Sequence, residues 1–166
     1  MEEIILDQIV IRKLNENDKE AFVNLRIMFL IDCFNSINES ISEMDKKEIE
    51  NNLNIYFENH INKNDFIGIV GEYNGNIVSL ACLVISDYPA YPGLLNGKAG
   101  KLLNVYTFPE FRKKGISKKI VKEIINEAKV NEVKSIELKS TEKGYNLYKK
   151  FGFIDDNFFK NMILEL

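Results

Sequence analysis

The sequence predicts a single α/β (α+β) domain that spans residues 1–166. Three observations predict this class: apolar residues at helical spacing over residues 17–61, a strand-turn-strand pattern over residues 66–85, and a strand-helix-strand order over residues 101–138. A chain of 166 residues with 45% hydrophobic residues can bury one substantial core but is short for two.

The first third of the chain predicts one strand and two helices. Residues 9–14 alternate in the manner of a strand, and Asn17 and Glu20 stand in capping positions for a helix that runs to about Phe34. A second helix is expected to begin near Ser42. The apolar residues that recur at helical spacing in the two helices are Phe22, Leu25, Met28, Phe29 and Cys33, then Ile49, Leu53, Tyr56, Phe57 and Ile61.

A hairpin is predicted by two β-type runs, residues 66–73 and 76–85, that are joined by Asn74-Gly75. Asn-Gly suits a type I′ turn because both of its residues tolerate a positive φ. A loop rich in Pro and Gly follows at residues 88–97.

The second half begins with a central strand at residues 101–108. A helix with a strong apolar stripe starts just after Gly115, and a strand at residues 133–138 follows it. This order is a βαβ unit, which predicts a right-handed crossover and two parallel strands. A short helix is expected at residues 141–150, and Phe151-Gly-Phe153 is expected to open a last pair of strands that ends at residues 162–166.

The turn between the central strand and its helix, Arg112-Lys-Lys-Gly115-Ile-Ser117, has the composition of a phosphate-binding site. Backbone N–H groups in the first turn of a helix lack intrahelical partners, and the helix dipole favours an anion there. Gly115 permits a positive φ or a close approach of the backbone. The alternative for such a turn by itself is an ordinary βα connection with solvated lysines.

Composition disfavours several other classes of site. His60 is the only histidine and Cys33 and Cys82 are the only cysteines, so neither a zinc cluster nor a Ser/His/Asp or Cys/His triad is expected. A net charge of −3 disfavours generic binding to nucleic acid. No apolar run reaches the roughly 20 residues of a membrane span, and the acidic N-terminus is unlike a signal peptide. We therefore expect a cytoplasmic protein with no nucleic-acid or membrane partner.

Two motifs carry a resemblance to a known family. Arg112-x-x-Gly115-x-Ser117 is followed about thirty residues later by Leu147-Tyr148-x-x-x-Gly152-Phe153, and the pair in this order resembles the GNAT superfamily of acyl-CoA N-acyltransferases. Ser117 stands where the family usually has Gly or Ala. The resemblance implies a mixed, mostly antiparallel sheet of six to seven strands, with splayed parallel central strands and about four flanking helices.

The resemblance also implies a cosubstrate, acetyl-CoA, and roles for individual residues, with no metal. Backbone N–H groups between Lys113 and Lys118 are expected to hold the pyrophosphate, and Arg112 begins this loop. The main chain at Val105 and Thr107 is expected to pair with the pantetheine arm, and amides near Val105 and Tyr106 to polarise the thioester carbonyl. The remaining candidates for contact with the cofactor are Lys114, Gly115, Ile116 and Ser117 in the loop, and Thr141 and Asn146 further on.

Tyr148 matches the family's general acid, since a phenol can return a proton to the departing thiolate. The general base stays open between a carboxylate, with Asp32, Glu72 and Asp87 as candidates, and a chain of water molecules. The function predicted first is direct transfer of an acetyl group to a primary amine of a small molecule or peptide. The alternatives are a non-catalytic acyl-CoA sensor and an α/β domain that binds no cofactor, and a homodimer is a further expectation because relatives often dimerise.

Overall fold

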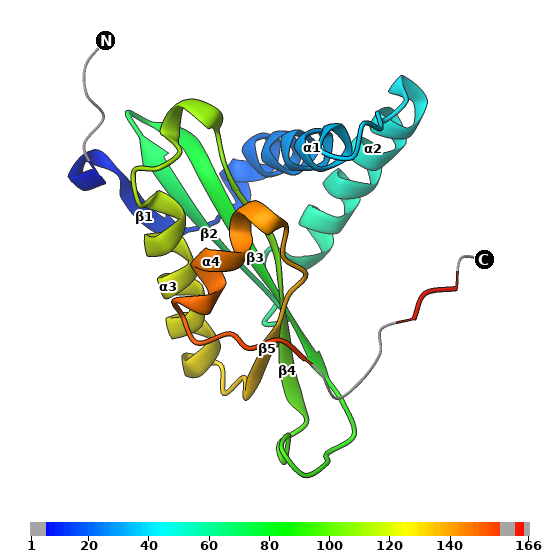
Figure 1. Cartoon of the computed structure of the whole chain (residues 1–166), viewed down its shortest axis with the longest axis vertical. Coiled ribbons are helices and arrows are strands. Elements are labelled where there is room, and N and C mark those ends of the chain that lie inside the picture. The colour runs from blue at the N-terminus through cyan, green and yellow to red at the C-terminus, as the bar shows by residue number, and fades with distance from the viewer. Residues whose placement is uncertain (1–5, 157–161, 165–166) are drawn as a thin grey trace.

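A computed structural model describes residues 6–156 and 162–164. Its centre is one five-stranded sheet with the order β1-β2-β3-β4-β5, covered by helices on both faces (Figure 1). The strands are β1 (Val10–Lys13), β2 (Phe66–Tyr73), β3 (Asn76–Asp87), β4 (Lys98–Thr107) and β5 (Ser135–Glu137). β1 to β4 pair antiparallel in succession, and β4 pairs parallel with β5. The predicted hairpin and the parallel pair are therefore confirmed.

Local sequence explains most of the element ends. Asn74 and Gly75 have φ values of 49° and 77°, the two positive angles that a type I′ turn requires. Ser42 caps α2 by accepting a hydrogen bond from the N–H of Asp45 at 3.1 Å. The α-helices are α1 (Lys19–Asn35), α2 (Glu43–His60), α3 (Ile116–Val130) and α4 (Glu142–Lys149). None of these described helices is both long and apolar enough to cross a bilayer.

The predicted cap of α1 is wrong. Asn15 and Asp18, rather than Asn17 and Glu20, form a capping box around a short 3₁₀ turn, Glu16–Asp18, that leads into the helix. The carboxylate of Asp18 is held by Arg12, with N–O distances of 2.7 and 3.0 Å. Asp18 is the N-cap residue of α1, but its carboxylate makes no capping bond to that helix because it accepts from Arg12 of β1 and from the N–H of Asn15.

The described residues form five strands, whereas six to seven are expected. Phe153–Asp156 and Met162–Leu164 belong to no strand. The rest of the predicted last pair, residues 157–161 and 165–166, lies outside the described residues. The other features of the fold class are confirmed: the sheet is mixed and mostly antiparallel, and four α-helices flank it.

Two apolar clusters, one on each face of the sheet, hold the layers together. The first joins Ile69, Leu83 and Leu102 of the sheet to Ile116, Ile120 and Ile124 of α3, and Tyr148 of α4 packs against it. The second joins Val70, Leu80 and Tyr106 to Phe22 and Leu25 of α1 and Phe57 of α2. Figure 1 shows this division, with α3 and α4 on one side of the sheet and α1 and α2 on the other.

The central strand β4 changes partners along its length. Its pairing with β5 ends at Lys101 opposite Glu137, so residues 102–107 have no described strand on that side. Its register against β3 shifts where Cys82 opposes Leu103 and Leu80 opposes Tyr106. Asn104 lies in this bulge with a φ of 54°, an angle that Asn tolerates better than most residues. The splay predicted for the parallel central strands is visible as this loss of pairing.

The α3 face of the core gives a stability prediction. Ile120 is fully buried between α3 and the sheet, so Ile120→Ala should lower the free energy of unfolding by about 2–5 kcal/mol through lost burial and a cavity. Urea denaturation followed by circular dichroism measures this change. Val130→Ala is the matched control, because Val130 ends the same helix and is 77% exposed. Equal losses in the two variants would contradict the assigned core.

Candidate functional site

The loop before α3 presents a row of unbonded backbone amides. Lys113 and Gly115 have φ values of 62° and 80°, which turn the chain tightly into the helix. The first bond of the helix runs from the N–H of Lys119 to the carbonyl of Gly115 at 3.2 Å. Among the described residues, none accepts a hydrogen bond from the N–H groups of residues 113–118. Such a run of free N–H groups at a helix N-terminus suits a phosphate.

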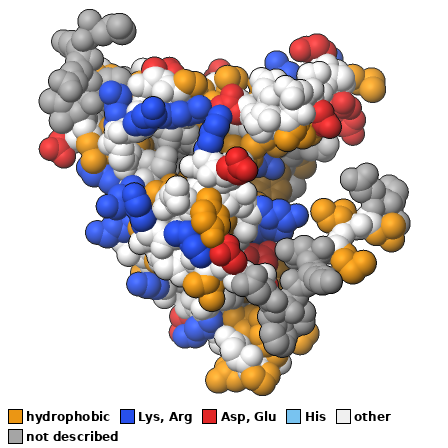
Figure 2. All heavy atoms as spheres, viewed as in Figure 1, with side chains coloured by type: hydrophobic (Ala, Val, Ile, Leu, Met, Phe, Trp, Pro, Cys, Tyr) orange, Lys and Arg blue, Asp and Glu red, His pale blue; other side chains and the backbone are white. Residues whose placement is uncertain are grey.

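Lysines surround these amides. Lys113, Lys114 and Lys118 lie in the loop and the first turn of α3, and Figure 2 shows Lys and Arg side chains gathered over α3 and the loop that precedes it. Lys119 is turned away, since its Nζ lies 3.4 Å from the carbonyl of Leu6 and 3.8 Å from Asp7. The positive charge available to a phosphate therefore comes from lysines of the loop.

Arg112 is already bonded within the protein. Its Nε donates to the carbonyl of Thr107 at 2.8 Å, and its Nη2 lies 2.6 Å from the carboxylate of Asp32 on α1. The guanidinium also lies over the ring of Tyr106, 5.3 Å from its centroid. Arg112 thus ties the end of β4 to α1, and Asp32, a candidate base, is the carboxylate that neutralises it.

Ser117 belongs to a chain of buried hydroxyl groups. Ser79 of β3 donates to the carbonyl of Tyr106 at 2.8 Å, so Thr107 donates to Ser79 at 2.6 Å and Ser117 donates to Thr107 at 2.8 Å. This chain joins β3, β4 and the first turn of α3. The hydroxyl proton of Ser117 is used inside the protein, which leaves its backbone N–H for a phosphate.

The open edge of β4 lies upstream of the loop. Val105 packs toward α3 and α4, whereas Tyr106 is buried on the α1 side. Thr107 ends the strand and is held by the hydroxyl chain. On the side away from β3, the backbone of residues 102–107 has no described strand beside it. An extended ligand that carries amides can make the hydrogen bonds that a neighbouring strand would make there.

Tyr148 lies on α4 against the α3-side cluster that includes Val105. Its ring meets Phe153 edge-on, with centroids 5.8 Å apart, and a Cβ added at Gly144 would lie 3.2 Å from that ring. Burial raises the pKa of Tyr148 to about 12, so the phenol is protonated at neutral pH. The structure therefore brings Tyr148 and the open stretch of β4 to the same cluster.

The two cofactor candidates beyond the loop, Thr141 and Asn146, lie at the start of α4 and within it. Thr141 caps α4 by accepting a hydrogen bond from the N–H of Gly144 at 3.3 Å, and it lines a hollow of about 270 Å³ with Ser140, Glu142 and Tyr145. Asn146 is exposed. Neither side chain is bonded to the loop before α3.

The other two candidate bases, Glu72 and Asp87, lie on the hairpin strands β2 and β3. Glu72 forms an ion pair with Arg12 at 2.8 Å, and Asp87 ends β3 at the far end of the strand from the hairpin. His60 stacks on Tyr56 and contacts Asp65. Within the described part of the chain, no group of three His, Cys, Asp or Glu side chains could hold a metal.

Sequence reasoning gave no role to Asn104, yet this side chain is buried and its amide oxygen and nitrogen have no hydrogen-bond partner among the described residues. The hydroxyl of Tyr106 is buried close to Asp32 and Arg112, and burial together with the charge of Asp32 raises the pKa of Tyr106. An Asn inside an otherwise apolar strand was a usable signal for the bulge, because Asn is depleted in strands and tolerates a positive φ.

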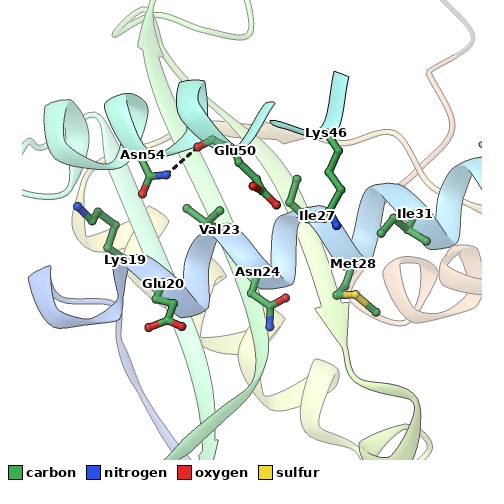
Figure 3. A pocket seen from close by; sticks show the side chains of 10 residues that line it. All are labelled: Lys19, Glu20, Val23, Asn24, Ile27, Met28, Ile31, Lys46, Glu50 and Asn54. Atoms are coloured by element: carbon green, nitrogen blue, oxygen red, sulfur yellow. Dashed lines mark hydrogen bonds between the residues drawn. The ribbon is translucent and has the colours of Figure 1, made fainter. Parts of the chain in front are cut away.

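A separate hollow of about 390 Å³ lies between α1 and α2 (Figure 3). Along α1 its lining runs from Lys19 to Ile31, and α2 contributes Lys46, Glu50 and Asn54. Figure 3 shows the side chains of Lys46 and Glu50 directed toward α1. This hollow shares no residue with the loop before α3 or with the open edge of β4.

The family model for the acetyltransferase (GNAT) family matches residues 30–153, three quarters of the chain. The chain belongs to this family. The match includes the bulge, the loop before α3 and Tyr148, so the sequence resemblance is confirmed at the level of the family. No curated protein matches the sequence.

Solved structures agree with this assignment. A predicted acetyltransferase with acetyl-CoA from Clostridium acetobutylicum is 28% identical, with a TM-score of 0.81 over 93% of this chain and 96% of that one. A GCN5-related N-acetyltransferase from Ralstonia eutropha JMP134 is 20% identical, with a TM-score of 0.79 over 93% and 98%. Glucosamine-6-phosphate N-acetyltransferase from Arabidopsis thaliana is also 20% identical, with a TM-score of 0.67 over 95% and 99%. The last two show the shared fold.

The hydroxyl chain gives a prediction about the unusual serine of the motif. Ser117→Ala should lower the free energy of unfolding by about 0.5–1.5 kcal/mol, the value of one internal hydrogen bond. The affinity for coenzyme A should change by less than about twofold, because the backbone N–H remains. Denaturation and calorimetry with coenzyme A measure the two effects. A large loss of affinity at unchanged stability would instead assign the hydroxyl to the phosphate.

Proposed function

We propose that this GNAT protein is an acetyl-CoA-dependent N-acetyltransferase that transfers the acetyl group directly to a primary amine. The observation that carries the proposal is the combination of free amides at residues 113–118 with an open strand edge at residues 102–107. The free amides bind the phosphates of coenzyme A, and the open strand edge binds its pantetheine arm, which carries amides. Acetyl-CoA supplies the activated acyl group.

Binding at this site depends on the main chain more than on charged side chains. Residues 113–118 donate N–H groups to the pyrophosphate, Lys113, Lys114 and Lys118 add positive charge, and Gly115 keeps the loop curved. Val105 and Thr107 offer backbone partners to the pantetheine amides. The N–H groups near Val105 and Tyr106 polarise the thioester carbonyl, where negative charge develops during attack.

The transfer forms a bond between the acceptor nitrogen and the acyl carbon and breaks the bond from that carbon to sulfur. A neutral amine loses one proton, which passes to a carboxylate or to water at the acceptor side, and the departing thiolate gains one. Tyr148 donates the proton that the thiolate gains, as general acid. A phenol of pKa about 12 is a weaker acid than a thiol of pKa about 8.5, so Tyr148 acts well only if the bound complex lowers its pKa.

The first experiment tests binding and turnover in sequence. Calorimetry with acetyl-CoA should show a saturable heat, and a panel of primary amines should then release free thiol at rates above those without enzyme. Binding without turnover on any amine would favour the acyl-CoA sensor. The absence of any heat would contradict the cofactor site itself.

The curvature of the loop gives a prediction with a close control. Gly115→Ala forces a side chain into a φ of 80° with only ordinary contact to Leu6, a strain of about 1–2 kcal/mol. The free loop should relax and the dissociation constant for coenzyme A should rise about tenfold. Gly75→Ala places the same strain in the remote hairpin, where φ is 77° and no atom is near. Calorimetry should show no change in the affinity of Gly75→Ala for coenzyme A. Equal affinities in the two variants would contradict the assignment of residues 113–118 as the phosphate-binding loop.

A second prediction concerns the general acid. Tyr148→Phe should lower kcat by about 10²- to 10⁴-fold while the affinity for acetyl-CoA stays the same, because the ring and its packing remain. Tyr145→Phe is the control: this residue lies on the same helix, and its hydroxyl bonds Asp155 at 2.8 Å. Steady-state assays of thiol release measure both. Unchanged turnover in Tyr148→Phe would remove Tyr148 from the mechanism.

A further inference from the structure

Arg26 is a partly buried cation without an acidic partner. It lies on the face of α1 that also carries Phe22, Phe29 and Cys33, and its guanidinium is 5.5 Å from the centroid of the Phe29 ring. Its guanidinium makes no hydrogen bond or ion pair with any described residue. The other two arginines of the chain are both paired, Arg12 with Asp18 and Glu72 and Arg112 with Asp32.

The groups around Arg26 do not balance its charge. The ionisable side chains close enough to affect the pKa of Arg26 are the thiols of Cys82 and Cys33. Burial raises the pKa of Cys82 to about 12 and also raises that of Cys33, so both thiols are neutral at pH 7. Burial lowers the pKa of Arg26 itself, yet a guanidinium stays protonated in proteins. A guanidinium that is partly withdrawn from water and has no carboxylate partner gains from an acidic ligand that pairs with it.

The position of Arg26 connects it to the site. Cys82, one of its two thiol neighbours, pairs in the sheet with Leu103 of β4, directly before the bulge at Asn104. Phe29, which lies under the guanidinium, also meets the ring of Tyr106, with centroids 6.3 Å apart. Arg26 therefore lies on the α1 face of the sheet beside the stretch of β4 that has lost β5. The amide of Asn104, which is buried and has no hydrogen-bond partner among the described residues, belongs to this same stretch.

We propose that the acceptor is an amine that also carries an acidic group, a carboxylate or a phosphate, and that Arg26 binds this group. The inference rests on the proposed transferase function and names the chemical class of its acceptor. A guanidinium suits such a group because its N–H donors match two oxygens of a carboxylate or phosphate at once. The phosphates of coenzyme A have their own seat at residues 113–118, so Arg26 is free for the second substrate.

The test compares amines that differ only in the acidic group. L-amino acids are paired with their amides, and glucosamine 6-phosphate with glucosamine, so that the carboxylate and phosphate sources are separated. Wild-type protein should prefer the acidic member of at least one pair by kcat/KM. In Arg26→Gln the KM for that member should rise about 10- to 100-fold, with kcat and the KM for the neutral member little changed. Lys47→Gln removes the same charge from an exposed position of α2 and should leave the preference intact.

A binding measurement keeps the proposal testable apart from turnover. With coenzyme A present, the acidic probe should raise the melting temperature of wild-type protein, and Arg26→Gln should abolish that shift. Thiol release that favours the neutral amines, or a preference for acids that survives in Arg26→Gln, overturns the assignment of Arg26 while the transferase function stands. Acid-dependent stabilisation without any turnover supports Arg26 and contradicts the transferase function. If Arg26→Gln does not fold, Arg26→Lys decides, because a lysine keeps the charge and should retain the preference with a weaker affinity.

Discussion

The site depends on the separation of β4 from β5 after Lys101. A strand in the middle of a sheet normally satisfies its backbone groups on both sides, and unsatisfied groups in a buried place are costly. β4 continues for six residues with β3 as its only described neighbour in the sheet, and α1 and α3 cover its two faces. The chain thus holds an open edge rigidly, which is what a ligand that binds like a strand requires.

The sequence predicted the elements whose formation depends on neighbouring residues. The Asn74-Gly75 turn, the Ser42 cap and the apolar stripe of α3 all follow from residues a few positions apart, and each is present in the structure. The cap of α1 was predicted wrongly: the residue before the helix is Asp18, whose carboxylate bonds Arg12 of β1 instead of the helix N–H groups. Local patterns carry no information about such an ion pair.

The same limit applies within the site. The motif around Gly115 and the motif around Tyr148 locate the loop and the candidate acid, because both are short and both determine local backbone shape. The partner of Arg112 is Asp32, 80 residues away, and Arg26 forms no ion pair with any described carboxylate, although Asp32 lies six residues further along the same helix. Neither fact can be read from spacing along the chain. Both change the chemistry, since one arginine of the chain is neutralised and another is left charged.

These two arginines are linked through Phe29 of α1. Phe29 lies three residues from both Arg26 and Asp32 and so neighbours each of them on the helix surface, while Arg26 and Asp32 lie about 120° apart around the helix axis. Phe29 contacts both the Arg26 guanidinium and the Tyr106 ring, and Tyr106 lies beneath Arg112, which Asp32 holds. The packing of α1 on β4 therefore sets the distance between the unpaired cation and the start of the phosphate loop. Because the thioester carbonyl is proposed to lie at the N–H groups near Val105 and Tyr106, this packing limits how far the amine of an acceptor can lie from its acidic group.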